Sequence, residues 1–199
     1  MRFSNRFKSS ARETMQNKAI PFFIVFFAAA LSLGAQTQDL PFVVGGDFDV
    51  EVFQYPHMIM IDTPTSDSFG TACTFIDSGG NYELRYGLFA QTEYEVPNIR
   101  RSFALFIIPI INNAAGFEVD LNEVELYDDQ DVADEFNGDI GVSVFIPDPP
   151  SEYGSGYRFM LLSFFCKINR GILMQAILFD DIEFAGTNEF LEISHSFSF

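Results

Sequence analysis

The sequence predicts an all-β protein made of about ten antiparallel strands. Apolar and polar residues alternate with a period of two along most of the chain after residue 46, as in strands with one buried face. Clusters of Pro, Gly, Asn and Asp separate the alternating runs, and these residues favour turns. Helical periodicity is weak in nearly all of the chain, so antiparallel strands joined by turns are the expected architecture.

The N-terminal segment has the three regions of an export signal. Residues 1–18 are polar and basic, residues 19–31 are apolar, and small residues follow up to Ala35. This order is typical of a signal peptide, so we expect residues 1–35 to be removed on export. An uncleaved anchor helix is the alternative interpretation, because the apolar segment could just span a bilayer. The remaining residues, 36–199, are expected to form a single all-β domain.

Alternation within the mature chain assigns the individual strands. In the segment 81–96, for example, Tyr82 and Leu84 lie on one face while Glu83 and Arg85 lie on the other. The segments expected to be strands are 47–54, 57–62, 69–77, 81–96, 101–112, 117–126, 139–147, 156–168, 171–184 and 188–199.

Three segments depart from simple alternation. Residues 103–111 and 159–165 are apolar on both faces, which is typical of strands buried inside a core. The segment near 127–138 begins with acidic residues and ends in Asn137-Gly138, so it is predicted to be an acidic loop or a short helix.

The chain has two cysteines, Cys73 and Cys166. In an oxidising compartment one disulfide could join them. Both lie in apolar stretches, where buried free thiols are equally ordinary. The sequence leaves these two alternatives open.

The charge is strongly acidic, with 11 Lys+Arg, 28 Asp+Glu and a formal net charge of −17. Such a surface repels phosphate backbones, so we expect no nucleic-acid partner. Acidic residues concentrate in the segment 118–139, and carboxylate oxygens there could bind calcium weakly. Counting from Asp129, however, position 6 is Asp134 where an EF-hand requires Gly, and a solvated acidic loop is the favoured interpretation.

The sequence offers no recognisable catalytic site. His57 and His195 are the only histidines, and neither accompanies a Gly-x-Ser-x-Gly motif or a zinc-ligand spacing. The segment Gly154-Ser-Gly156 lacks the third glycine of a dinucleotide-binding loop. We therefore expect no catalytic residues, no cofactor and no metal ligands, and a protein that is not an enzyme; the oligomeric state is left open.

The C-terminal nine residues carry the most specific pattern. Leu191, Ile193, Phe197 and Phe199 are apolar at alternate positions, and only His195 interrupts the series. This segment resembles the C-terminal strand of small bacterial outer-membrane β-barrel proteins. The resemblance implies that the four apolar residues form an assembly signal in an antiparallel up-and-down β-barrel of about 8–10 strands. It also implies outer-membrane lipid and the barrel-assembly machinery as partners.

The resemblance implies an outer-membrane location with a structural, adhesive or small-solute-passage role. The alternative is a soluble antiparallel β-sandwich in the periplasm or outside the cell, acting as a binding module without catalytic activity. The segments that are apolar on both faces favour this alternative, because they fit a core between two sheets.

Overall fold

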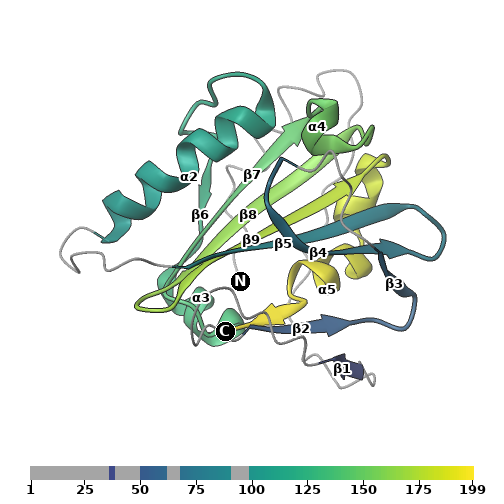
Figure 1. Cartoon of the computed structure of the whole chain (residues 1–199), viewed down its shortest axis with the longest axis horizontal. Coiled ribbons are helices and arrows are strands. Elements are labelled where there is room, and N and C mark those ends of the chain that lie inside the picture. Colours follow the sequence, from purple (N-terminus) through teal and green to yellow (C-terminus); the bar gives the residue numbers. More distant parts are fainter. Residues whose placement is uncertain (1–35, 39–49, 62–67, 91–98) are drawn as a thin grey trace.

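A computed structural model describes residues 36–38, 50–61, 68–90 and 99–199; the predicted signal peptide, 1–35, lies outside the described residues. A seven-stranded antiparallel sheet dominates this part of the chain, in the order β3-β4-β5-β9-β8-β7-β6 (Figure 1). Its strands are β3 (Met58–Ile61), β4 (Thr71–Asp77), β5 (Tyr82–Ala90), β6 (Glu125–Leu126), β7 (Ile140–Pro147), β8 (Phe159–Lys167) and β9 (Gly171–Phe179). A second, three-stranded sheet contains β1 (Gln36–Gln38), β2 (Glu51–Gln54) and β10 (Phe197–Ser198).

The large sheet is open, because β3 and β6 lie at its two edges and do not pair with each other. A barrel requires every strand to be paired on both sides. The predicted up-and-down barrel is therefore wrong, and so is the resemblance to outer-membrane barrels. The structural, adhesive or solute-passage role and the outer-membrane location depended on that barrel and are not retained.

Helices in the described part of the chain also overturn the all-β class and its β-sandwich alternative. They are α2 (Ile99–Ala115), α3 (Asp129–Phe136), α4 (Ser151–Gly154) and α5 (Asn188–Ser194), with the 3-10 helix η2 (Ile182–Gly186) before α5. The protein is a mixed α/β structure with an open antiparallel sheet.

Helix α2 occupies the predicted strand 101–112. Phe103, Ile107 and Ile111 are buried at intervals of four residues, while Leu105 is 64% exposed. A continuous apolar run is compatible with either a buried strand or a helix, so the period-two interpretation was not decisive here. The predicted strand 117–126 is likewise wrong for most of its length, since only β6 is strand.

Helix α5 and β10 replace the predicted terminal strand 188–199. The side-chain oxygen of Thr187 accepts a hydrogen bond from the backbone N–H of Phe190 at 3.1 Å and caps the start of α5. Of the four residues assigned to the assembly signal, Leu191 and Ile193 lie in this helix and Phe197 lies in β10. Together with Phe199, they do not form the single strand that the resemblance implied.

Both faces of the large sheet are buried along its central strands. Every residue of β9 is buried, and its side chains alternate between two apolar clusters. Leu173 and Ile177 pack with residues of α3, α5, β2 and β10; we call this the α5 face. Ile172 and Met174 pack with α2; we call this the α2 face. The elements on each face can be followed in Figure 1.

An ion pair is buried on the α2 face. The Nε of Arg85 donates to Oε1 of Glu83 at 2.6 Å, and the two residues are 1% and 5% exposed. The two terminal nitrogens of Arg85 donate to the carbonyl of Tyr153 at 3.0 Å and to the hydroxyl of Ser155 at 2.5 Å. Arg85 therefore attaches α4 and the residue after it to the sheet.

Replacing Arg85 by Met should lower the free energy of unfolding by about 3–5 kcal/mol, because the Glu83 carboxylate would remain buried without its cation. Urea denaturation monitored by circular dichroism measures the change. The matched control is Arg100→Met, because Arg100 pairs with Asp129 at the surface and its loss should cost less than about 1 kcal/mol. Equal losses for the two variants would contradict the role assigned to the buried pair.

The two phenylalanines near the C-terminus should contribute unequally to stability. Phe197 is fully buried, so Phe197→Ala should lower the free energy of unfolding by about 3–5 kcal/mol. Phe199 is partly exposed at the chain end, so Phe199→Ala should cost about 1 kcal/mol or less. The same urea experiment tests both, and a larger loss for Phe199 would be inconsistent with the packing described.

Candidate functional site

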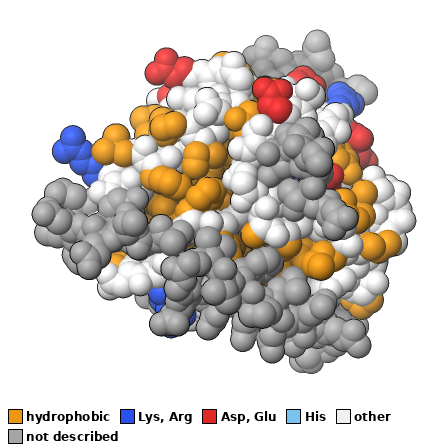
Figure 2. All heavy atoms as spheres, in the orientation of Figure 1, with side chains coloured by type: hydrophobic (Ala, Val, Ile, Leu, Met, Phe, Trp, Pro, Cys, Tyr) orange, Lys and Arg blue, Asp and Glu red, His pale blue; other side chains and the backbone are white. Residues whose placement is uncertain are grey.

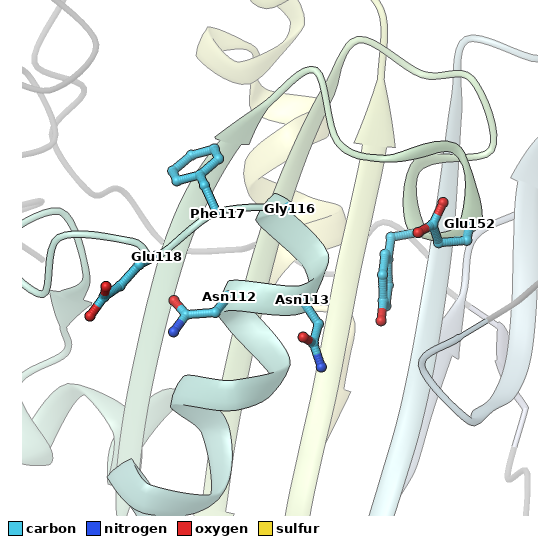
Figure 3. A pocket seen from close by; sticks show the side chains of 7 residues that line it. Asn112, Asn113, Gly116, Phe117, Glu118 and Glu152 are labelled. Carbon is cyan, nitrogen blue, oxygen red and sulfur yellow. The ribbon is translucent and has the colours of Figure 1, made fainter.

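A shallow pocket of about 470 Å³, largely open to solvent, lies between the C-terminal end of α2 and α4 (Figure 3). Its lining residues come from the last turn of α2, from the segment that follows it, and from α4. They are Asn112, Asn113, Gly116, Phe117, Glu118, Glu152 and Tyr153.

The end of α2 forms one wall of the pocket. The backbone N–H of Gly116 donates to the carbonyl of Asn112 at 2.9 Å, and the φ of +76° at Gly116 favours glycine. A Cβ at this glycine would lie 3.0 Å from the side chain of Pro150, so α2 ends directly against the segment that precedes α4. The side-chain oxygen of Asn112 accepts a hydrogen bond from the backbone N–H of Val119 at 2.9 Å, which holds the segment after α2 against the end of the helix.

Helix α4 forms the opposite wall, and it is held by buried groups. Arg85 binds the carbonyl of Tyr153 and the hydroxyl of Ser155. The ring of Tyr153 packs edge-on against Phe69, with ring centroids 4.9 Å apart. Because Arg85 and Phe69 are both buried, this wall is anchored to the core.

The lining is polar and acidic with exposed aromatic surface. Glu118 and Glu152 are both exposed, and Figure 3 shows them on opposite sides of the last turn of α2. The side chain of Asn113 is exposed, and Phe117 is 53% exposed. Among the lining residues there is no Lys, Arg, His, Cys or Ser. The pocket can therefore accept hydrogen bonds and contact a ring or alkyl group.

Both histidines lie on the α5 face. The Nε2 of His57 is 2.8 Å from the hydroxyl of Tyr82 and 3.4 Å from a carboxylate oxygen of Glu189 in α5. The Nε2 of His195 is 2.8 Å from a carboxylate oxygen of Glu135 in α3. Burial raises the pKa of the Tyr82 phenol, and the nearby carboxylates of Glu189 and Asp77 raise it further. These contacts join α5 to neighbouring elements at both of its ends.

Several carboxylates of the acidic segment 118–139 have structural partners. Asp128 caps α3 by accepting from the N–H of Gln130 at 2.9 Å. Asp139 accepts from the N–H of Ile168 at 2.7 Å. Within the described residues, no group of three or more His, Cys, Asp or Glu side chains could hold a metal ion. Weak calcium binding in this segment stays a prediction.

The cysteines are two buried free thiols. Cys73 belongs to the cluster on the α5 face and Cys166 to the cluster on the α2 face. Their strands, β4 and β8, are separated by β5 and β9. A disulfide needs Cα atoms within about 7 Å, whereas three strand spacings come to about 14 Å. A bond between Cys73 and Cys166 does not fit this geometry.

The pocket residues were not identified from the sequence, apart from Glu118 as one member of the acidic segment. A usable signal was present, because Asn112-Asn113 and Gly116 follow an apolar run as helix C-terminal residues do. Interpreting 101–112 as a strand removed that signal.

Within the residues that the structure describes, no helix combines the length and apolar character needed to cross a membrane. No protein-family model matches the chain, and no curated protein matches it. The chain is similar to the solution structure of cyanobacterial PsbP (CyanoP) from Synechocystis sp. PCC 6803. The TM-score is 0.46 and the identity 14%, over 74% of this chain and 85% of that chain. The likeness is distant, and the fold described above depends on this chain's own strands and helices.

The buried thiols should be unreactive in the folded protein. Burial raises the pKa of Cys73 and of Cys166 to about 12 from a reference value of 9.0. A thiol reagent at about pH 8 should therefore label neither residue in the native protein and both in urea. A chain that shows no free thiol even in urea would contain the disulfide that the geometry excludes.

The same pKa shifts predict how stability depends on pH. Well below pH 9.0 both thiols are protonated in the folded and unfolded states and contribute no slope. Above that pH the unfolded chain ionises first, so the free energy of unfolding should fall as pH rises toward about 12. Urea denaturation across this range should show a smaller fall for the variant with Cys73→Ala and Cys166→Ala.

Proposed function

We propose that the protein is an exported binding domain without catalytic activity, and that its ligand site is the pocket between α2 and α4. The observation that carries this proposal is a pocket whose walls are anchored to the core while its rim presents exposed amide, carboxylate and aromatic side chains. Small-molecule sites commonly combine an apolar lining with a few polar groups that orient the ligand, and here Phe117 and Tyr153 supply the apolar surface.

The N-terminal sequence supports export. Its basic, apolar and small-residue regions have the order of a signal peptide, which would deliver residues 36–199 to the periplasm or the cell exterior. The binding role therefore concerns a ligand met outside the cytoplasm.

The distribution of reactive groups supports a non-catalytic role. His57 and His195 are paired with glutamates on the α5 face, and both cysteine thiols are buried with a raised pKa. The imidazoles and thiols are thus held in contacts outside the pocket, and the two carboxylates of its lining, Glu118 and Glu152, have no imidazole, thiol or amine beside them among the lining residues.

A titration followed by amide NMR tests the site. The probes are benzylammonium, benzyl alcohol and benzoate, which share one ring and differ in charge. We expect at least one probe to shift the amide signals of residues 112–118 and 152–153 in a saturable way. No saturable shift with any of the three probes would contradict the proposed function.

Two tryptophan variants locate the binding. Asn113→Trp should abolish the shifts, because a large side chain at this exposed lining position would fill the pocket. Leu105→Trp is the matched control: Leu105 is also exposed on α2, but it does not line the pocket. Binding that survives Asn113→Trp, or that Leu105→Trp removes, would place the site elsewhere.

A further inference from the structure

We propose that two copies of this chain associate through the outward face of α2, with the two helices antiparallel about a two-fold axis. The centre of this face, around Leu105, does not line the ligand pocket, so association and ligand binding can be tested separately. Three features point to a second copy as the partner: the apolar character of the face, the charges at the two ends of the helix, and the acids in the segment that follows it.

The face of α2 that points away from the sheet is apolar. Phe103, Ile107 and Ile111 are buried against the sheet. On the other side of the helix Leu105 is 64% exposed, and Pro109, one turn later, is also exposed. A helix that is apolar on all sides is normally covered on all sides. Figure 2 shows hydrophobic side chains gathered over α2, as expected for an interaction surface.

Exposed apolar side chains concentrate on this part of the chain. Within the residues that the structure describes, six large hydrophobic side chains are exposed, and four of them lie in α2 or in the segment that leads from α2 to the end of β6. These four are Leu105, Phe117, Leu121 and Leu126. Single exposed apolar residues are ordinary, whereas a cluster marks a surface that contacts a partner.

The charges at the two ends of α2 are opposite to those that its dipole favours. Arg100 and Arg101 lie in the first turn, at the positive end of the dipole, and that turn contains no acid. Glu118 lies three residues beyond Ala115, close to the negative end. Figure 2 shows basic side chains at the left of the face that carries α2, and acidic side chains along its upper edge.

An antiparallel second copy turns both of these unfavourable positions into favourable ones. It brings Arg101 of each copy to the negative end of the other helix and Glu118 of each copy to the positive end. Arg101 is the arginine available for this contact, because Arg100 already pairs with Asp129. The surface is therefore complementary to itself, which is what an interface with two-fold symmetry requires.

One register satisfies the apolar and the charged contacts together. With the two-fold axis between positions 105 and 109, Leu105 of each copy faces Pro109 of the other, and Arg101 faces Asn113. The long Arg101 side chain then extends toward Glu118, which follows the turn at Gly116. Two antiparallel helices that cross at about 20° keep these ends close to each other.

A lipid surface suits this face less well than a second copy. Asp120 and Glu123 are exposed on either side of Leu121, so a bilayer that took up Leu121 would also meet these two carboxylates. The net charge of −17 opposes an anionic membrane, and at long range it opposes a second copy as well. Only the second copy offers Arg101 a carboxylate at contact distance in return.

The size of the contact predicts a weak dimer. A 17-residue helix is about 25 Å long and about 10 Å wide, so α2 alone presents a face of about 250 Å² in projection. A standard interface buries about 800 Å² per partner. Phe117 is 53% exposed directly after α2 and adds apolar area there. We therefore expect a reversible dimer with a dissociation constant of about 10–100 µM.

Sedimentation equilibrium of the purified protein over a range of concentrations measures this constant. Leu105→Glu should raise it at least about tenfold, because a carboxylate would be buried against Pro109 of the other copy. Ile59→Glu is the matched control: Ile59 is also exposed, at 53%, but it lies in β3 at one edge of the sheet. An unchanged far-UV circular dichroism spectrum shows that each variant is folded.

Charge exchanges test the antiparallel arrangement. Arg101→Glu and Glu118→Arg should each raise the dissociation constant about three- to tenfold, because each places like charges together at both ends of the helix pair. The double variant restores opposite charges and should return the constant to within about twofold of the original. The two single exchanges change the net charge in opposite directions, so a purely long-range effect would make the Glu118→Arg dimer tighter.

Four results would overturn the proposed dimer. They are a protein that stays monomeric at about 1 mM, a dimer that Leu105→Glu leaves unchanged, a dimer that Ile59→Glu weakens as much, and a tighter dimer with Glu118→Arg. Sedimentation of the monomer with vesicles of phosphatidylcholine and phosphatidylglycerol, lost in Leu105→Glu, would assign the face to lipid and overturn it too. The titration with benzyl probes reports on the pocket alone, so the proposed function and the dimer can fail independently.

Discussion

Burial of the central strands on both faces is the constraint on which the rest of the structure depends. All of β9 is buried, so the sheet is stable in water only if separate elements cover each side. Helix α2 covers one face, and α3, α5, β2 and β10 cover the other. Polar groups inside these layers must be paired, as Arg85 is with Glu83 and as Gln175 is with the carbonyl of Ile193 at 3.0 Å.

The positions of the two walls of the candidate pocket depend on contacts with this core. Arg85 has more donors than Glu83 alone can accept, and two of them bind the carbonyl of Tyr153 and the hydroxyl of Ser155. The requirement to satisfy a buried cation thus fixes α4 over the sheet. On the other side, the close approach of Gly116 to Pro150 sets how near the end of α2 can come. The spacing of the two walls follows from an ion pair and a glycine.

Most of the large sheet could be predicted from the sequence, because β3, β4, β5, β7, β8 and β9 alternate or are continuously apolar between clear turn signals. Whether this sheet closes into a barrel or stays open could not be predicted. A barrel strand faces lipid on one side only, whereas the run 159–165 is apolar on both sides and needs cover on both. That observation favoured a layered structure. The helix that covers one face, α2, lies in the other apolar run, 103–111, whose pattern did not distinguish a helix from a buried strand. The pocket depends on that helix and was missed with it.

The C-terminus shows why a short alternating pattern is weak evidence for a strand. Apolar residues at 190, 193 and 197 also have the spacing of a helical turn followed by an extended residue. Two contacts favour the helix over the single strand. Thr187 caps α5, and the ring of Phe136 in α3 stacks on Phe197 with ring centroids 4.9 Å apart. The last residue is then held by a hydrogen bond from its N–H to the carbonyl of Phe136 at 3.0 Å. An aromatic residue at the chain end can therefore pack in the protein's own core. Apolar residues at alternate positions before it do not by themselves indicate a strand that faces lipid.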